Sequence, residues 1–325
     1  MSQAKFGRNY ILAIQIPSEL GGTAASLGQQ AGINADIQPN TVNNNETLII
    51  QPPFTIEFDI TRNTLTSTNI AQIRIFNLSK QNRNLIRFNR NDMGLGSFKG
   101  ITLQAGYGYT PTGTYVPTNN LPIIFTGNIT DAHSYREGVN YITEITSTDG
   151  GYAFANDFLS TNFPANYPIQ LMLGDMVGLL SYVTKGAIGS YPGNLSRGIA
   201  VCGYTCELLR EHSGQGFFID NGSAHCLGES EYISDGDVIL VNSQSGLLNT
   251  PIREETHLTF DMIFEPNMKP GRLIQLQSST DPVFNGFRKV LGVKHRGMIS
   301  TAICGEVTTN VTTNYIQDLT PVTVV

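Results

Sequence analysis

Apolar and polar residues alternate strictly in two stretches of the first hundred residues. The segment FTIEFDIT begins at Phe54, and the segment AQIRI begins at Ala71 after a loop rich in Asn and Thr. A period of two predicts a strand with one buried and one polar face. We expect these two strands to pair antiparallel, with Phe54, Ile56, Phe58 and Ile60 facing a core. Ser79 is expected to cap a short helix that runs through Arg87.

The same pattern predicts further strands before residue 163. They cover 10–16, 100–106, 121–130 and 139–148, and the last two read as a hairpin around Arg136–Glu137–Gly138. Between the first strand and Phe54 lies a long polar segment, residues 17–47, with few apolar side chains of its own. Such a segment is typically ordered by a partner. These elements predict an antiparallel β domain over residues 1–163.

The pattern changes to a helical period after residue 163. Apolar residues follow Pro168 at spacings of three and four, which predicts an amphipathic helix over 168–185 that Gly186 ends. A second helix is predicted over 196–212. Asn221-Gly222 lies between apolar runs and predicts a two-residue type I′ hairpin turn. Residues 164–235 are therefore expected to form a small α+β domain.

Alternation returns in the last third of the chain. Strands are predicted over 236–241, 258–264, 272–276, 287–295 and 300–314, again in antiparallel pairs. They predict a second β domain over residues 236–325. The fold class is then mainly β (α+β), with two antiparallel β domains on either side of the middle domain, an arrangement that suggests duplication.

Composition narrows the classes of function. The chain has 325 residues, of which only 14% are charged, and its net charge is −6 without any basic run. A nucleic-acid-binding surface would need a basic patch, so this function is disfavoured. Few charges suit a protein that buries much of its surface in partners. The apolar runs are too short to span a membrane, so no membrane insertion is expected, and the N-terminal residues lack a signal-peptide pattern.

Motifs of catalysis are missing from the sequence. It contains no G-x-S-x-G, HExxH, Walker A or dinucleotide-binding fingerprint. The histidines, His133, His212, His225, His257 and His295, show no ligand spacing and are expected to be structural. The pairs Glu254-Glu255 and Glu229/Glu231 could form a hydrolase site, although solvated loop charge is the favoured interpretation. No catalytic residue is assigned.

The cysteines are the most suggestive set of side chains. Cys202 and Cys206 are four residues apart on a predicted helix, while Cys226 and Cys304 lie far from them. Four thiolates could hold an iron–sulfur cluster or zinc, but this spacing is a weak signal. Buried free thiols in a protein that folds in a reducing cytoplasm are the favoured interpretation, and no cofactor is expected.

Several of these stretches together resemble a known family. The strand FTIEFDITR, the segment IRIFNLS followed by NRNLI, and the later segments LPIIFTGNI, GFFIDNG and FNGFRKVLGVKHRGMIS are similar to those of the baseplate hub proteins of contractile-tailed bacteriophages. The resemblance extends over nearly the whole chain. No appended lysozyme-like domain is visible.

The resemblance implies a structural role in the virion. Members form a ring, typically a homotrimer, whose tube-like β domains join the hexameric tail tube to the trimeric central spike. It implies tail tube protein, spike and baseplate wedge proteins as partners, passage of double-stranded DNA without specific binding, and assembly in the cytoplasm of the bacterial host. The alternative is a β-rich cell-wall or polysaccharide hydrolase of the tail tip.

Overall fold

The computed structural model describes residues 7–16, 47–64, 68–89, 99–108, 120–301, 305–314 and 319–323. Its elements are mainly strands in antiparallel sheets, which confirms the predicted fold class. The polar segment 17–47 lies outside these ranges except for its last residue, and Cys304 also lies outside them. The predictions made for both therefore remain predictions. No helix among the described residues is long and apolar enough to cross a membrane.

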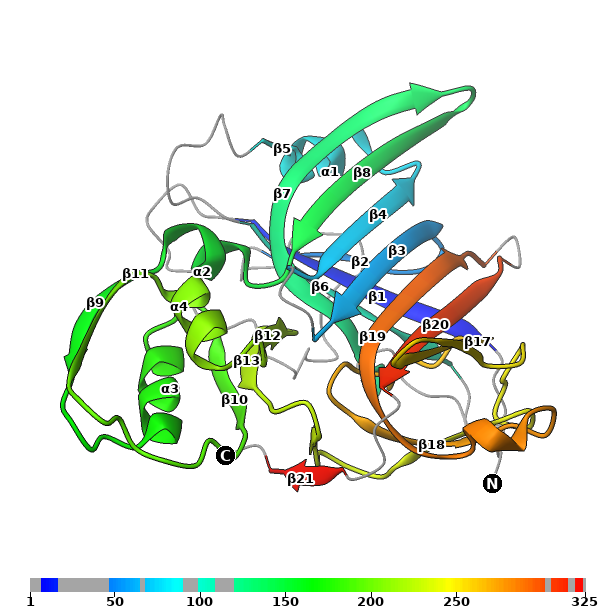
Figure 1. The fold of residues 1–325 in the computed structure, drawn as a ribbon. Coiled ribbons are helices and arrows are strands. Elements are labelled where there is room, and N and C mark those ends of the chain that lie inside the picture. Colours follow the sequence, from blue (N-terminus) through cyan, green and yellow to red (C-terminus); the bar gives the residue numbers. More distant parts are fainter. Residues whose placement is uncertain are drawn as a thin grey trace.

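Eight strands lie side by side and form the front layer of a 14-stranded sheet (Figure 1). Each is antiparallel to its neighbours. In sheet order they are β16 (Ile252–Glu254), β17 (His257–Ile263), β20 (Val307–Asn314), β19 (Gly286–Ile299), β3 (Ile56–Asn63), β4 (Ile70–Phe76), β8 (Asn140–Thr148) and β7 (Ile123–Glu137). Pairing of β3 with β19 brings strands from the first and the last third of the chain into one sheet.

A back layer covers the apolar face of β3, β4 and β8. It contains β2 (Thr47–Ile50), β1 (Arg8–Gln15), β6 (Lys99–Tyr107) and the first half of β7. An irregularity between Ile129 and Asp131 bends β7, so that its second half continues in the front layer beside β8. Ile56, Phe58 and Ile60 are buried between the layers as predicted, and Phe54 packs against them partly buried.

A short helix continues the chain after β4. The hydroxyl of Ser79 accepts a hydrogen bond from the backbone N–H of Asn82, which confirms the predicted cap of α1 (Lys80–Ile86). After α1, β5 (Phe88–Asn89) adds two residues to the outer edge of β7.

The last third of the chain repeats the bent-strand design. A register shift between Val290 and Gly292 lets the first half of β19 pair with β18 (Leu273–Gln277) and the second half with β20 and β3. A separate core lies beneath these strands, with Phe260, Met262 and Ile274 among its members. β15 (Ile239–Asn242) pairs with β18 in parallel, so the prediction of purely antiparallel strands here was wrong. The 3-10 turn η2 (Pro282–Phe284) precedes β19.

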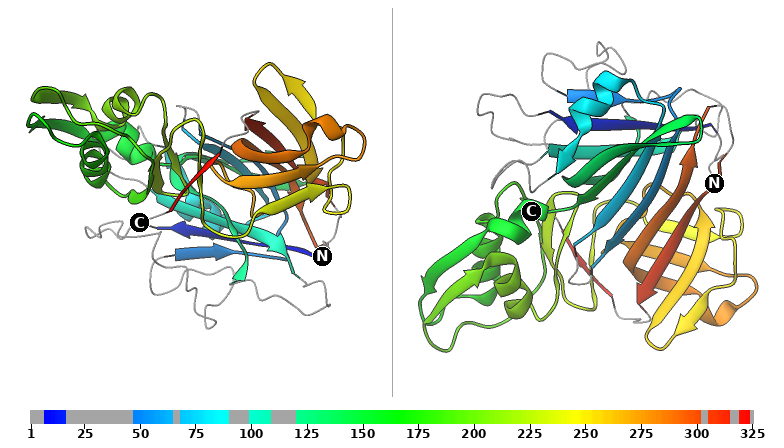
Figure 2. Two further views of the ribbon diagram at one scale, coloured as in Figure 1. Left: turned by 60° about the horizontal axis from the view of Figure 1, so that its bottom comes forward. Right: turned by 90° about the horizontal axis from the view of Figure 1, so that it is seen from above.

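The middle of the chain forms a smaller unit beside the sheet (Figure 2). It contains helices α2 (Gly151–Asn156), α3 (Ile169–Gly178) and α4 (Thr205–His212) and three small sheets. The strands of these sheets are β9 (Phe158–Phe163) with β11 (Ile199–Tyr204), β10 (Thr184–Ile188) with β13 (Ser223–Cys226) and β12 (Phe217–Asp220), and β14 (Glu231–Ile233) with β21 (Thr320–Val322).

Two helix predictions in this unit need correction. α3 ends at Gly178, and residues 184–188 form β10 because this segment pairs with β13. The predicted helix over 196–212 begins only at Thr205, because residues 199–204 pair with β9 as a strand. The predicted turn is confirmed, since Asn221 and Gly222 both have positive φ, 49° and 73°. The domain boundaries at 163 and 235 stay a prediction.

Candidate functional site

The exposed face of the front layer is mainly polar, with Ile70, Tyr135 and Ile252 as exposed apolar or aromatic exceptions. Alternation turns the apolar side chains of each strand inward, and the register aligns the remaining side chains in rows across the sheet. Arg74 lies between Glu57 and Glu144, at 3.7 and 3.5 Å, and Asp59 lies 3.2 Å from Lys294. These exposed ion pairs add little stability each, but they neutralise the cations of the face.

The charge of this polar face is negative. Thr, Asn and Gln occupy many of its positions, for example Gln72, Thr308 and Asn310. Among the described residues its register positions carry more carboxylates than cations: Glu57, Asp59, Asp131, Glu137, Glu144, Glu254 and Asp261 against Arg74, Lys294 and Arg296. A face of this composition repels a phosphate backbone more than it attracts one.

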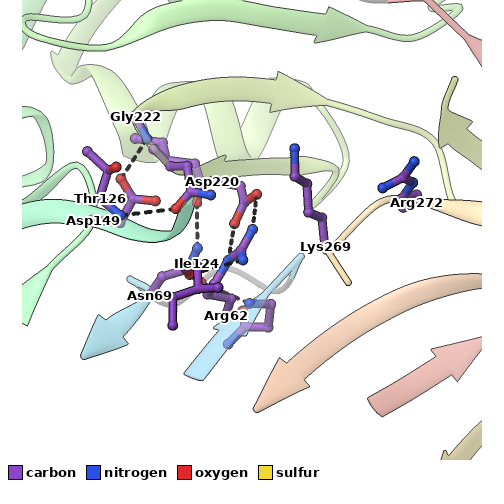
Figure 3. A network of polar contacts seen from close by, with 12 residues as sticks. Arg62, Asn69, Ile124, Thr126, Asp149, Asp220, Gly222, Lys269 and Arg272 are labelled. Carbon is purple, nitrogen blue, oxygen red and sulfur yellow. Dashed lines mark hydrogen bonds and ion pairs between the residues drawn. The ribbon is translucent and has the colours of Figure 1, made fainter. Parts of the chain in front are cut away.

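A buried polar joint connects the sheet to the middle unit (Figure 3). Arg62 of β3 is fully buried and binds the carboxylate of Asp220 with two parallel hydrogen bonds, Nε–Oδ1 at 2.7 Å and Nη2–Oδ2 at 2.6 Å. Its Nη1 donates to the carbonyl oxygen of Ile124 at 3.1 Å. A buried guanidinium needs such a bidentate partner, because an unpaired charge in this environment would be very costly.

The hairpin turn of the middle unit is held by the sheet through its backbone. The Asn69 side chain donates to the carbonyl oxygen of Ile219 at 2.8 Å, and the backbone N–H of Thr126 donates to the Asn221 side chain at 3.0 Å. Gly222 N–H donates to Oδ1 of Asp149 at 3.0 Å. The turn is therefore fixed to three sheet segments by hydrogen bonds as well as by the Arg62 ion pair.

Asp149 is the member of this joint whose hydrogen bonding is incomplete. It is 2% exposed, and its Oδ2 atom has no hydrogen-bond partner among the described residues. Burial, and to a smaller extent the nearby Asp220 carboxylate, raise the pKa of the Asp149 carboxyl to about 7. The Gly222 N–H and Arg62 oppose this shift. Asp149 thus changes its protonation near neutral pH, whereas the Arg62–Asp220 pair is held by direct contact.

The sequence carries a signal for this joint that the motif search missed. Arg62 continues the series Ile56, Phe58 and Ile60 at the same spacing of two, so its side chain must enter the buried face. A charge in that register requires a buried acidic partner. The identity of the partner, Asp220, could not be read from the sequence, because it depends on contact between distant segments.

The structure does not bring the predicted cysteine ligands together on one helix. Cys202 is exposed on β11 and Cys206 is buried on α4, so the helical spacing argument was wrong. Burial raises the pKa of the Cys206 and Cys226 thiols to about 12, which keeps both protonated. Among the described residues no group of three or more His, Cys, Asp or Glu side chains could hold a metal ion.

Two of the histidines are buried in structural contacts. Nδ1 of His225 accepts a hydrogen bond from the Ala187 N–H at 2.9 Å, and His295 contacts the Thr309 hydroxyl at 3.0 Å. Burial lowers the pKa of His225 to about 4 and that of His295 to about 3, so both are neutral at physiological pH. His133 is exposed and contacts Asp131 at 2.8 Å.

The glutamates proposed as a hydrolase pair have different surroundings. Glu231 is buried, and its carboxylate accepts hydrogen bonds from the backbone N–H groups of Ser190 and Gly228, both at 2.7 Å. Glu229, Glu254 and Glu255 are exposed. The Glu231 carboxylate therefore fixes two loops.

Solved structures that share this fold include two proteins described as tail proteins and a component of a secretion system. A tail protein from Neisseria meningitidis MC58 matches with a TM-score of 0.51 and 10% identity, covering 81% of this chain and 96% of its own. The 43 kDa tail protein of prophage MuSo2 from Shewanella oneidensis matches with a TM-score of 0.50 and 8% identity, covering 83% and 94%. The chain thus shares its fold with these two tail proteins.

A third structure with this fold comes from a secretion system. It is an E. coli protein of the type VI secretion system, described as similar in structure to the T4 bacteriophage tail proteins gp27 and gp5. Its TM-score is 0.54 at 8% identity, and the match covers 82% of this chain and 74% of that one. At these identities the likeness concerns the fold alone.

The sequence itself gives the family. Residues 39–291 match the family described as baseplate hub gp41, and the chain belongs to that family of structural phage tail proteins. This confirms the resemblance inferred from the strand motifs. No curated protein matches the sequence.

Proposed function

We propose that the protein is the central hub of a contractile-tail baseplate, a homotrimeric ring that joins the tail tube to the central spike. The observation that carries this proposal is the front layer itself. The bent strands β7 and β19 each pair along one half with front-layer strands and along the other half with strands behind that layer. Pairing of β3 with β19 places the front-layer strands of both regions in one sheet. Each chain would thus supply two similar wall segments, and three chains would supply six, which suits a hexameric tube above a trimeric spike.

The polar face would line the lumen in this arrangement. DNA that passes through a ring should not bind tightly to the wall of the ring. A wall without a basic patch avoids such binding, because it does not displace the counterions of the phosphate backbone. The excess of carboxylates on the polar face, with its ion-paired Arg74 and Lys294, supports this orientation. Tail tube protein, spike and wedge proteins would be the partners, and assembly would take place in the host cytoplasm.

The oligomeric state provides the first test. Native mass spectrometry of the purified chain, alone and with its spike partner, is expected to give a trimer. Class averages of the same sample should show a ring with a central opening. A chain that stays monomeric with the spike partner bound would contradict the proposal.

A charge-reversal variant tests which face lines the opening. The wild-type ring is expected to bind double-stranded DNA weakly at low salt. Changing Glu57 and Asp59 to Lys in each chain would surround Arg74 and Lys294 with further cations. DNA affinity at low salt should therefore be higher than that of the wild type, and it should decrease steeply as salt is added. The matched control changes Glu211 and Glu229, exposed acids of the middle unit, to Lys. Equal DNA binding by both double variants would contradict the assignment of the lumen.

A further inference from the structure

Four basic side chains gather where α1 packs beside the arm formed by β7 and β8 (Figure 1). They are Lys80, Arg83 and Arg87 along α1 and its C-terminal cap and Arg136 of β7, and together they are called the α1 patch. The guanidinium of Arg83 lies 3.9 Å from the centre of the Tyr141 ring, and that of Arg136 lies 5.9 Å from the same ring. This ring therefore holds cations of the helix and of the arm close together.

The α1 patch lies on the side of the arm opposite the polar face. Tyr141 alternates along β8 in step with the buried Thr143, whereas Glu144 points to the polar face. Arg136 pairs with Tyr141 and so shares its side, while Glu137, the next residue of β7, points to the other side. The two sides of the arm therefore carry opposite charge.

No described carboxylate neutralises the α1 patch. None of its four cations forms an ion pair with another residue that the structure describes. The stretches that surround it, residues 76–89, 132–136 and 139–143, contain no Asp or Glu. Nε of Arg83 is buried and has no hydrogen-bond partner in the described part of the chain. The patch is thus an uncompensated cationic surface on a chain whose net charge is −6.

The charges of α1 are also unfavourable for the helix itself. Lys80, Arg83 and Arg87 follow one another at spacings of three and four, which places like charges on one face. Lys80 occupies the first helical position and the first turn has no acidic residue, the opposite of what the helix dipole favours. Violations of local preference that nothing nearby offsets are typical of functional surfaces.

Apolar exposure beside these charges favours a protein over a nucleic acid as the partner. Val139, at the tip of the arm, is 87% exposed, and Tyr141 is 39% exposed. Arg and Tyr are among the side chains that dominate the binding energy of protein interfaces, whereas a phosphate backbone offers Val139 no apolar contact. The four cations can neutralise at most four phosphates, fewer than the roughly six to ten contacts of a typical DNA complex.

We infer that the α1 patch docks another protein through carboxylate groups on that partner's surface, with Val139 and Tyr141 covered by apolar side chains of the same partner. A guanidinium can bind a carboxylate with two parallel hydrogen bonds, and the Lys80 ammonium binds one as a point charge. The inference goes beyond the proposed ring, because the patch belongs to a single chain and lies on the side opposite the polar face.

Carbodiimide cross-linking of purified tail particles that contain this chain tests the contact. The reagent joins a lysine amine to a carboxylate at ion-pair distance. Mass spectrometry should therefore find Lys80 linked to an Asp or Glu of a different protein. Lys294, whose Nζ lies 3.2 Å from the Asp59 carboxylate, is the internal positive control. A sample that contains the Lys294–Asp59 link and no Lys80 link, or a Lys80 link only to this same chain, would overturn the inference.

Binding by the purified full-length chain separates carboxylates from phosphates. The probes are fluorescein-labelled poly-L-glutamate and a short labelled DNA duplex, followed by anisotropy at low salt. Lys80→Gln with Arg87→Gln should weaken poly-L-glutamate binding by about tenfold. The matched control, Lys185→Gln with Arg197→Gln, makes the same charge change at exposed positions of the middle unit and should leave binding unchanged.

Three results would contradict the assignment. Equal weakening by both double variants would show that binding is not local to the α1 patch. Tighter binding of the duplex, lost only in the Lys80 and Arg87 variant, would make the patch a nucleic-acid surface. A lower urea midpoint for that variant would show that its cations stabilise the chain, whereas removal of like-charge repulsion should keep the midpoint at or above that of the wild type. These outcomes are independent of the oligomeric state that tests the ring.

Discussion

Asp149→Asn should make the stability of the protein less dependent on pH. The pKa of the Asp149 carboxyl is raised from 3.8 to about 7 in the folded chain, so the folded state binds this proton more tightly than the unfolded state. The stability from this group is complete below pH 4 and is lost as the pH rises to about 7. Between pH 5 and pH 8 the loss is about 2.7 kcal/mol, from two pKa units at 1.36 kcal/mol each.

The asparagine variant removes the charge and keeps the shape of the side chain. Its Oδ1 can still accept from the Gly222 N–H, so the hairpin turn should stay attached to the sheet. Urea unfolding at pH 5 and pH 8 measures the difference. Wild type should lose up to about 2.7 kcal/mol more than the variant between the two values. Asp59→Asn, at an exposed carboxylate of the polar face, is the control for general charge removal. Parallel pH profiles of wild type and Asp149→Asn would refute the reasoning.

Three further predictions concern single side chains. Phe58→Asp places an unpaired charge in the main core and should prevent folding; soluble, assembly-competent protein would show that the face is wrongly assigned. Arg62→Met leaves the Asp220 carboxylate buried and unpaired and should cost about 3–5 kcal/mol in urea unfolding, whereas Arg74→Met at an exposed pair should cost under about 1 kcal/mol. Cys202 should react with a thiol reagent at pH 8 in the native protein and Cys206 only after unfolding, because Cys206 is buried; equal rates would contradict this.

Short-range patterns predicted much of this fold. The alternation of β3 and β4, the Ser79 cap and the Asn221-Gly222 turn are set by neighbouring residues, and the structure has all of them. The failures occurred where distant pairing overrides local preference. Residues 199–204 have helical spacing but form a strand, since β9 supplies their hydrogen bonds.

The candidate site was less predictable than the fold. The polar face follows from alternation alone, yet its extent depends on the β3–β19 pairing, which no local pattern encodes. The buried joint could be predicted only in part. The register of Arg62 demands a carboxylate, but Asp220 at the end of β12 and Asp149 just after β8 are far from Arg62 in the sequence. The cysteine hypothesis relied on a helix that does not form at Cys202.

The pairing of β3 with β19 also constrains when the protein can fold. Ile56 pairs with Ile299, and Asn63 with Gly292, so the ribosome must make nearly the whole chain before this ladder can form. Until then β3 presents an open edge to other nascent chains, and contacts of such high sequence separation form slowly. A subunit truncated before β19 would lack this ladder and keep that edge exposed. Incorporation into a tail would thereby be restricted to chains whose synthesis is complete.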